Sequence, residues 1–283
     1  MIIFISGASG YLGSNLVKAL SNEHSVFALV RKTSSIERIK DVDVNLIYVD
    51  DVKELERSFE AYRPDIIINT AALYGRKGES LSALVTANID FPIKLYELAN
   101  QYNSKAFIHT GTSLPDEISL YALTKNTFVK LAKFSSENQL KFIDIALEHF
   151  YGPGDDNSKF TSYVINSCIA GEKLALTDGL QKRDFIYIDD VITAYKILVN
   201  NLDKLGQCET ISLGSGTAPN IREFVEMVHV CSLSKSMLEF GAVAMRSNEL
   251  MYSCADTDRL NQLGWQPKYS IEIGIKAILK GRI

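Results

Sequence analysis

The sequence predicts an α/β fold in which a doubly wound parallel sheet carries a smaller, threaded C-terminal lobe. Short apolar runs alternate with helical stripes of apolar residues along roughly the first half of the chain. A turn with three glycines follows the first apolar run directly. Two later runs end in small or hydroxylated residues, at 69–72 and 110–113. Together these observations indicate a Rossmann-type sheet.

The strongest local signal is the strand, turn and helix at the start of the chain. An apolar run at residues 2–5 predicts a buried strand, and a helical stripe begins at Leu12. Between them, Gly7 suits a tight turn, Gly10 the close approach of a pyrophosphate, and Gly13 close helix packing. The helix N-terminus then faces the phosphates. Three glycines are also compatible with a tight turn alone, but the flanking pattern favours nucleotide binding.

The same alternation continues to about residue 150. We expect further strands over residues 25–30, 46–49, 66–68, 106–109 and 142–147, and helices over residues 52–62, 84–102 and 120–134. Strands that alternate with helices in this way form a parallel sheet with right-handed crossovers.

Beyond this point the simple alternation fades. We expect residues 1–150 to form a dinucleotide-binding domain, with 184–216 returning to it. Residues 151–183 and 217–283 would form the smaller lobe.

Bulk composition excludes several classes of protein. A chain of 283 residues can form one large domain or two small ones. Its net charge of −4 and the lack of a basic run argue against a nucleic-acid partner, and no apolar run reaches membrane-spanning length. The start of the chain has no signal peptide pattern, so we expect a cytoplasmic protein. The scattered cysteines favour free thiols over disulfides and predict no metal site: Cys168, Cys208, Cys231 and Cys254.

The candidate catalytic group is a trio of polar residues near the middle of the chain. Thr112 lies at a predicted strand end, and Tyr121 and Lys125 lie four apart on the following helix, so they share one face. A phenol normally has a pKa of about 10, and a nearby ammonium lowers it. Such a phenol can protonate an alkoxide while the hydroxyl of Thr112 binds the same oxygen. A Tyr-x-x-x-Lys spacing also arises about once by chance in such a chain, as a surface helix pair.

The end of the second predicted strand carries Arg31 and Lys32. An NAD-preferring site places a carboxylate there to bind the ribose 2′-hydroxyl. Two cations instead favour the 2′-phosphate of NADP(H), although a solvated charge pair at a strand end is the alternative.

Several motifs occur in an order that resembles a known family. The sequence is similar to extended short-chain dehydrogenase/reductases, the NAD-dependent epimerase/dehydratase family, whose members act on nucleotide-activated sugars. The motifs that carry the resemblance are Gly7-x-x-Gly10-x-x-Gly13, Asn69-x-Ala71-Ala72, Thr112, Tyr121-x-x-x-Lys125, Tyr151-Gly152-Pro153-Gly154 and Arg183 to Val191.

More narrowly, the sequence resembles the CDP-paratose and CDP-abequose synthases, which reduce the C4 ketone of a CDP-4-keto-3,6-dideoxyhexose. The stretches that carry this narrower resemblance are residues 70–76, 111–115, 147–152, 159–162 and 248–256.

The resemblance implies a role for each matched position. Tyr121 would donate the proton, Lys125 would bind the nicotinamide ribose and tune Tyr121, and Thr112 would hold the ketone oxygen, with Ser113 as second choice. The implied cofactor-binding residues are Gly7, Ser9, Gly10, Tyr11, Leu12, Gly13, Arg31, Lys32, Asp50, Asp51, Asn69, Ala71, Ala72 and Lys125.

The implied substrate-binding residues are Tyr74, Arg76, Ser113, His149, Lys159, Phe160, Arg183, Arg246 and Glu249. Arg183 and Arg246 would clamp the diphosphate bidentately, and a surface ion pair is the alternative for either. His149 stands where many relatives have another residue, and is either a substrate contact or a structural histidine.

A departure from the pattern narrows the expected chemistry. The related 4,6-dehydratases carry an Asp-Glu pair directly after the hydroxyl residue, where this chain has Ser113-Leu114. Elimination of water needs that acid and base. Asp116 and Glu117 lie beyond Pro115 and are not expected to replace them.

The sequence therefore predicts an NADPH-dependent reductase of the C4 ketone of a nucleotide-activated 4-keto-6-deoxy or 3,6-dideoxy sugar, with NAD as a possible cofactor. A CDP-sugar is favoured over dTDP-, GDP- and UDP-sugars, and the product would enter surface polysaccharide such as lipopolysaccharide O-antigen. One alternative is an epimerase with tightly bound NAD, and another is a non-catalytic dinucleotide-binding regulator. We also expect a homodimer formed by helices over residues 84–102 and 120–136.

Overall fold

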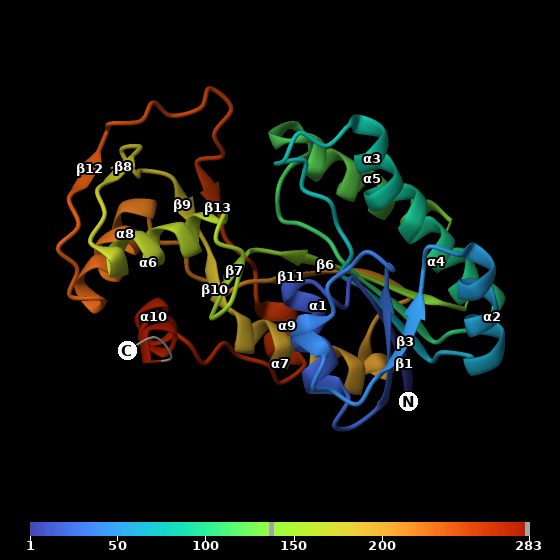
Figure 1. Ribbon diagram of the computed structural model, residues 1–283. Helices are drawn as coiled ribbons and strands as arrows, with labels where there is room; N and C mark the ends of the chain where they lie inside the picture. The colour runs from blue at the N-terminus through green and yellow to red at the C-terminus, as the bar shows by residue number, and fades with distance from the viewer. Residues whose placement is uncertain (136–138, 281–283) are drawn as a thin grey trace. The chain divides into compact units, whose positions relative to one another are not determined.

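The computed structural model describes residues 1–135 and 139–280 and divides into two compact units (Figure 1). The first unit is Met1–Ala146 with Tyr195–Ile211, and the second is Leu147–Ala194 with Ser212–Ile283. Residue 136, the last of the helix expected over 120–136, lies outside the described residues.

The first unit is built on a seven-stranded sheet in the order β11-β6-β5-β4-β1-β2-β3. Every pairing from β6 across to β3 is parallel. The predicted α/β class with a doubly wound parallel sheet is confirmed. The strands are β1 (Ile2–Ser6), β2 (Ser25–Val30), β3 (Asn45–Tyr48), β4 (Ile66–Asn69), β5 (Ala106–Thr110), β6 (Lys141–Leu147) and β11 (Cys208–Leu213).

Helices separate these strands along the chain, as parallel pairing requires. They are α1 (Tyr11–Leu20), α2 (Val52–Tyr62), α3 (Leu81–Val85), α4 (Phe91–Gln101), α5 (Leu120–Phe134) and α7 (Ile188–Asn200), with short helical turns at Glu37–Ile39, Asp116–Ile118 and Leu202–Lys204.

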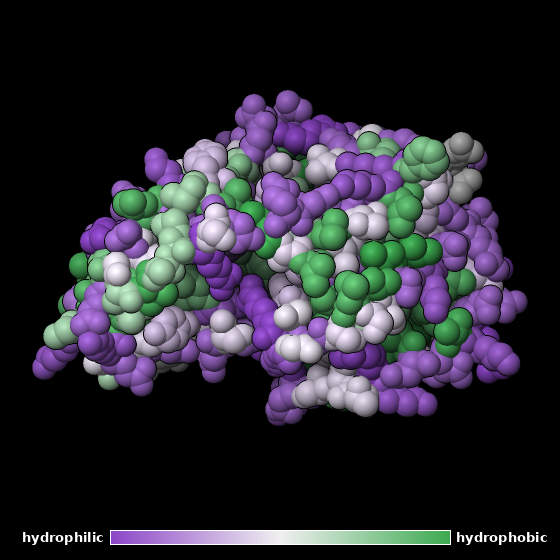
Figure 2. All heavy atoms as spheres, turned by 90° about the horizontal axis from the view of Figure 1, so that it is seen from above, coloured by the Kyte–Doolittle hydropathy of each residue, from purple (hydrophilic) through white to green (hydrophobic). Residues whose placement is uncertain are grey.

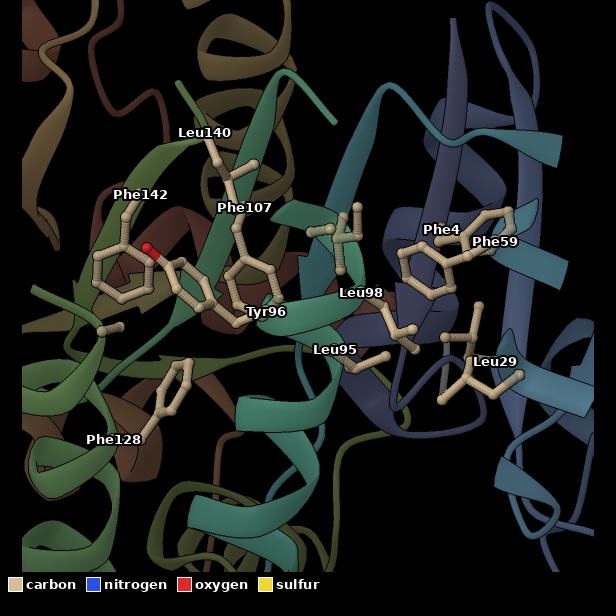
Figure 3. Close-up of a cluster of buried hydrophobic side chains, with 14 of the residues drawn as sticks. Phe4, Leu29, Phe59, Leu95, Tyr96, Leu98, Phe107, Phe128, Leu140 and Phe142 are labelled. Carbon is tan, nitrogen blue, oxygen red and sulfur yellow. The ribbon is translucent and has the colours of Figure 1, made fainter. Parts of the chain in front are cut away.

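An aromatic core fixes α2, α4 and α5 on one face of the sheet (Figure 3). Phe107 of β5 and Phe142 of β6 are fully buried there, and Phe128 of α5 and Tyr96 of α4 pack against them. Buried aromatic side chains of this size account for a large share of the core energy. The core therefore packs α4 and α5 against β5 and β6.

The prediction of a single continuous helix over residues 84–102 is wrong, because the structure has three helical segments there. The structure has α3, then a π-helical segment at Thr86–Asp90, then α4. Pro92 at the start of α4 has no N–H to donate one turn back, which weakens the regular ladder at that point. Single-turn π segments often lie at functional sites, and this one positions Asn88.

The second unit contains three small parallel strand pairs and packs its own core. The pairs are β7 (His149–Tyr151) with β10 (Phe185–Tyr187), β8 (Leu174–Leu176) with β12 (Leu238–Phe240), and β9 (Lys182–Arg183) with β13 (Tyr252–Ser253). Its other helices are α6 (Phe160–Ala170), α8 (Ile221–Cys231), α9 (Asp258–Gln262) and α10 (Ile271–Lys280).

Two contacts tie helices of the second unit to other segments of that unit. The rings of Phe185 and Phe224 stack with centroids 4.3 Å apart, which joins β10 to α8. The carboxylate of Asp190 accepts from the backbone N–H groups of Lys268 and Tyr269, both at 2.9 Å. Among residues 1–135 and 139–280, no helix is long and apolar enough to span a bilayer.

Candidate active site

The glycine turn after β1 is packed too tightly for side chains. Gly7 has a φ of +68°. The turn is closed by a 2.9 Å hydrogen bond from the N–H of Gly10 to the carbonyl of Gly7. A Cβ on Gly13 would lie 2.2 Å from the carbonyl oxygen of Gly7. A Cβ on Gly7 would meet the backbone of Ala71 at 2.7 Å. The helix α1 therefore begins directly against the ends of β1 and β4.

The start of α1 suits a bound phosphate. Its N-cap residue, Gly10, provides no side-chain hydrogen bond, and the first turn has no acidic residue. The first N–H groups of the helix and its positive dipole end therefore remain available to an anion. Ser9 and Tyr11 are half-buried beside this turn, whereas the side chain of Leu12 is buried in the core.

The ends of β2 and β3 carry opposite charges. Arg31 and Lys32 are both exposed after β2, and the carboxylate of Asp50 accepts from the Lys32 backbone N–H at 2.6 Å. The neighbouring Asp51 caps α2 by accepting from the backbone N–H of Lys53 at 2.9 Å. Asp51 thus has a structural task in addition to the cofactor contact that the resemblance implied.

A third cation lies close to this region. The guanidinium of Arg38 lies over the ring of Tyr11, 5.5 Å from its centroid. This contact brings the loop after β2 next to the start of α1. Arg38 has no periodic signal in the sequence, because it belongs to a single short helical turn at Glu37–Ile39.

Asn69 stabilises the interior of the sheet. Its side chain is fully buried, its carbonyl oxygen accepts from the hydroxyl of Ser6, and its amide nitrogen lies 3.0 Å from Nδ1 of His109. The half-buried backbone at Ala71 and Ala72 follows directly. Asn69 therefore fixes the strand end from which those two alanines present their backbone.

Lys125 is a nearly inaccessible ammonium on α5, with 1% of its surface exposed. Burial lowers its pKa to about 7, and the negative charge of Asp144 opposes this change. A lysine that titrates near neutrality changes charge within the physiological range.

Tyr121 lies one turn before Lys125, and its ring stacks on Tyr74 with centroids 4.7 Å apart. Burial raises the pKa of Tyr121 well above its usual range, and the neighbouring Tyr74 raises it further. The cation that lowers this pKa is Arg76, whose guanidinium lies 5.0 Å from the centroid of the Tyr74 ring. In this structure Arg76 thus exerts the electrostatic effect that was expected of Lys125.

Asn88 fixes the loop that carries Tyr74 and Arg76. Its side chain accepts from the N–H of Leu73 and donates to the carbonyl of Leu73, both at 2.9 Å. The same amide donates to the hydroxyl of Thr124 on α5, also at 2.9 Å. Asn88 was not among the predicted site residues, and its one sequence signal is Pro92, which breaks the helix nearby.

Thr112 and Ser113 follow β5 in the same unit. The hydroxyl of Thr112 accepts from the N–H of Leu114 at 3.2 Å, which closes a tight local turn. Further along, the carboxylate of Asp116 accepts from the Asn126 amide at 2.7 Å and pairs with Lys130. Asp116 is therefore engaged with the side of α5 and is not free to act as an acid or base.

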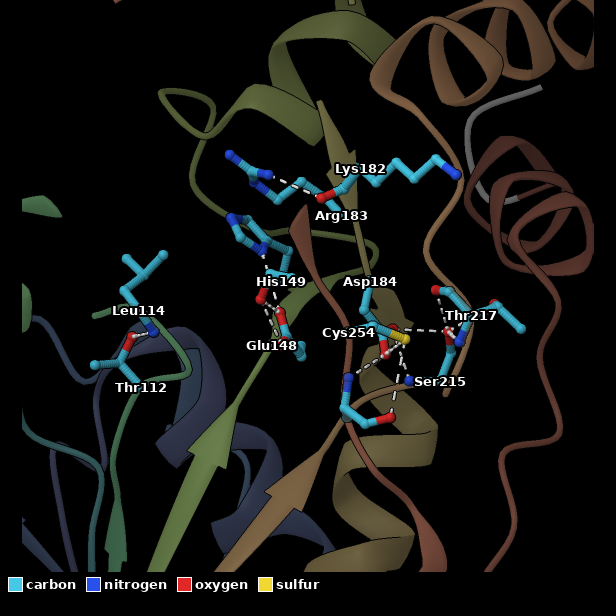
Figure 4. A network of polar contacts seen from close by, with 12 residues as sticks. Thr112, Leu114, Glu148, His149, Lys182, Arg183, Asp184, Ser215, Thr217 and Cys254 are labelled. Carbon is cyan, nitrogen blue, oxygen red and sulfur yellow. Dashed lines mark hydrogen bonds and ion pairs between the residues drawn. The ribbon is translucent and has the colours of Figure 1, made fainter. Parts of the chain in front are cut away.

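The predicted substrate residues of the second unit include a buried ion pair. Arg183 is buried and donates to the carboxylate of Glu249 at 2.6 Å. Burial lowers the pKa of Arg183, and Glu249 and Glu148 oppose this change. Glu148 accepts from the Ser253 hydroxyl at 2.7 Å and lies 3.7 Å from Nδ1 of His149 (Figure 4).

The remaining predicted substrate residues lie apart from this ion pair in sequence. Lys159 pairs with Asp155 at 3.1 Å, and Phe160 begins α6 with its ring partly exposed. Arg246 is exposed in the loop between β12 and β13.

Comparison with known proteins identifies the family. The model of the NAD dependent epimerase/dehydratase family matches residues 3–214. The chain belongs to this family. It is 31% identical to a CDP-abequose synthase of Salmonella typhimurium, covering 98% of this chain and 97% of that protein, and 32% identical to one of Salmonella muenchen, covering 98% and 96%. The predicted family, the narrower similarity and the assignment as an NAD(P)-dependent enzyme are confirmed.

Solved structures of this family share the fold. The UDP-glucose 4-epimerase of Thermotoga maritima, solved with UDP-glucose, has a TM-score of 0.86 at 22% identity and covers 99% of this chain and 98% of its own. MoeE5, solved with UDP-glucuronic acid and NAD, has a TM-score of 0.85 at 22% identity, covering 100% and 99%.

The packing of Gly13 leads to a prediction about cofactor binding. In Gly13→Ala the new methyl group must displace the Gly7 carbonyl, so the glycine turn must open. We expect NAD(P)H to bind at least about tenfold more weakly, or ~1.4 kcal/mol, in a fluorescence titration. In the control Gly206→Ala the Cβ lies 3.6 Å from its nearest neighbour and binding should be unchanged. Equal affinity in both variants would contradict the assignment.

Proposed function

We propose that this protein uses NADPH to reduce the C4 ketone of a nucleotide-activated 4-keto-6-deoxy or 3,6-dideoxy sugar. The observation that carries the proposal is the pair Tyr121 and Lys125 on one face of α5, in a chain similar over its length to CDP-abequose synthases. The product would be a deoxysugar nucleotide for surface polysaccharide. A cytoplasmic location fits this role because its substrates are soluble metabolites.

The residues of the first unit suit proton donation to a ketone oxygen. When bound, NADPH supplies the hydride. Tyr121 holds its proton at neutral pH because its pKa is raised, so it is a phenol when the reaction begins. Negative charge that develops on the sugar oxygen draws that proton, and the hydroxyl of Thr112 donates to the same oxygen. The positive charge of Arg76 favours the phenolate that remains.

The contacts of Asp116 favour reduction over elimination. A dehydratase needs a carboxylic acid and a base beside the hydroxyl residue. Here Leu114 follows Ser113, and the carboxylate of Asp116 is bound to Asn126 and Lys130. Neither Ser113 nor Leu114 can therefore supply the acid and base that remove water.

The second unit would hold the nucleotide part of the substrate, with CDP favoured. Arg183 is the best candidate for a diphosphate clamp because its guanidinium is already held in place by Glu249. A diphosphate would replace Glu249 as its partner. Further candidates for contacts with the nucleotide sugar are the exposed Arg246 and Phe160 and the half-buried His149 and Lys159.

An epimerase is the second candidate, because solved structures that share this fold include UDP-glucose 4-epimerases. An epimerase retains NAD and returns the hydride to the other face. Purified protein that carries bound NAD and converts its substrate without added cofactor would favour this function. The regulator would be favoured if the protein bound NADPH but none of the keto sugars tested caused NADPH to be oxidised.

A homodimer is also proposed, from the apolar side chains exposed on the first unit. Figure 2 shows apolar residues gathered on the face that carries α3 and α5. They include Leu81, Leu120, Leu123 and Leu131, each 42–58% exposed. Exposed apolar patches of this kind often mark interfaces.

The first functional prediction concerns Tyr121. Tyr121→Phe removes the proton donor, so reduction should fall at least about a thousandfold while NADPH binding stays within about twofold. NADPH consumption against CDP-, dTDP-, GDP- and UDP-4-keto-6-deoxy sugars measures it, with the product configuration read by NMR. Tyr62→Phe, which removes a partly exposed hydroxyl on α2, serves as control. Retained turnover in Tyr121→Phe rules out the assignment.

A second functional prediction concerns the preference for NADPH over NADH. Replacing Arg31 and Lys32 together by Ala removes two exposed cations after β2, so the dissociation constant of NADPH should rise about tenfold or more. NADH binding should change less than about threefold because NADH lacks the 2′-phosphate. Lys18→Ala, an exposed lysine near the end of α1, is the matched control. Equal losses for both cofactors would remove the basis for NADPH preference.

The third concerns assembly. Leu123→Glu combined with Leu131→Glu places two charges in the exposed apolar face of α5, and light scattering after size exclusion should report a monomer. Leu233→Glu, at a position 90% exposed in the second unit, should leave the dimer intact. A wild-type protein that is monomeric at micromolar concentration would contradict the proposal.

A further inference from the structure

A buried carboxylate lies on the β6 strand behind the candidate catalytic residues. Asp144 is 6% exposed, and a Cβ on Gly111 would lie 2.2 Å from its Oδ1. Its Oδ2 accepts a long 3.4 Å hydrogen bond from the hydroxyl of Thr210, while Oδ1 has no hydrogen-bond partner among the described residues. A carboxylate in such a place is costly unless a positive charge stabilises it.

The groups around Asp144 come from four elements of the first unit. On β5, His109 lies in register with it. On α5, Lys125 and Lys133 both act on it as positive charges, and Lys133 donates to Thr210 on β11. On α7, the phenol of Tyr195 is hydrogen-bonded to Thr110 at 2.6 Å.

Of these groups, His109, Tyr195 and Lys133 carry no negative charge that could balance the ammonium of Lys125. His109 is neutral, because burial and the charge of Lys125 hold its pKa well below the usual range. Burial raises the pKa of Tyr195 far above neutrality, so it too is uncharged. Lys133 is a cation and lies toward the surface. Asp144 supplies the negative charge in this group.

We propose that Asp144 is the buried counter-charge that keeps Lys125 protonated, and so a positioning residue for the reaction. The inference rests on the proposed function, in which Lys125 holds the nicotinamide ribose as an ammonium. Asp144 and Lys125 lie on facing sides of the same interface: Asp144 is two residues after Phe142 on β6, Lys125 is three residues before Phe128 on α5, and the rings of Phe142 and Phe128 are 5.9 Å apart. The described residues show no direct ion pair between Asp144 and Lys125, so the carboxylate acts across space. The three N–H groups of Lys125 therefore stay available for the cofactor.

The charge states of the two residues support each other. Burial raises the pKa of Asp144 to about 6, and Lys125 and Lys133 oppose that change. Burial lowers the pKa of Lys125 to about 7, and Asp144 opposes that change. Each residue therefore favours the charged form of the other. Removing the carboxylate must lower the pKa of Lys125 further, and its ammonium must be lost at a lower pH.

Asp144→Asn tests the inference because it keeps the shape of the side chain and an oxygen that accepts from Thr210. We expect the affinity for NADPH to fall on raising the pH in both proteins, with the fall displaced to lower pH by about one unit in the variant. Binding at pH 8 should therefore be about tenfold weaker than in the wild type and recover toward pH 6. The pH profile of kcat/KM should be displaced in the same direction.

Two controls separate charge from general damage. Asp65→Asn makes the same chemical change in the same unit, at a carboxylate that pairs with Lys105 and accepts from the Ile2 N–H, and should not move the pH profile. In a Lys125→Met background, Asp144→Asn should produce no further displacement. The inference is overturned if NADPH binds to Asp144→Asn more weakly by the same factor at every pH, or if its affinity does not change at all.

A second measurement does not depend on the folding of Asp144→Asn. In Lys125→Met, the Asp144 carboxyl should titrate at higher pH than in the wild type, as followed by carbon-13 NMR, because the coupling of two charges is reciprocal. An unchanged titration contradicts the inference. If no keto sugar is reduced but these shifts occur, the proposed function fails and the role of Asp144 stands. If reduction occurs without the shifts, the reverse holds.

Discussion

The burial of one ammonium group determines much of the first unit. Lys125 is almost inaccessible, and water is not there to stabilise its charge. The surrounding residues meet this constraint in two ways. His109 is neutral and bound to Asn69, so it adds no second cation, and Asp144 provides the opposite charge from the next strand. The aromatic core formed by Phe107, Phe128 and Phe142 then holds α5 against the sheet so that this arrangement keeps its geometry.

The irregular helix after β4 has a related effect on the tyrosine. A regular helix would not give Asn88 the same direction, since the π segment inserts an extra residue into the turn. From there Asn88 joins the loop after β4 to Thr124, one turn from Tyr121. The positions of Tyr74, which stacks on Tyr121, and of Arg76 therefore depend on the π-helical segment that holds their loop.

The sequence predicted what local periodicity encodes. The strands, the glycine turn and the face shared by Tyr121 and Lys125 all follow from spacing within a few residues, and the structure has them. The roles of Arg38, Asn88 and Asp144 were not predicted, because they arise from contacts between segments distant in the chain. Asp144 sits within the apolar run of β6, where a single polar residue gives no periodic signal. The pairing of Arg183 with Glu249 could not be predicted for the same reason, since it joins β9 to the loop between β12 and β13.

The space between Gly111 and Asp144 also limits how this protein can evolve. The carboxylate of Asp144 fills the volume that any side chain at position 111 would need. A lineage that replaces the glycine must therefore first, or simultaneously, accept a smaller residue on β6, and it gives up the charge in doing so. These two positions should drift together across homologous genes, and a lineage that keeps the acid should be unable to leave glycine.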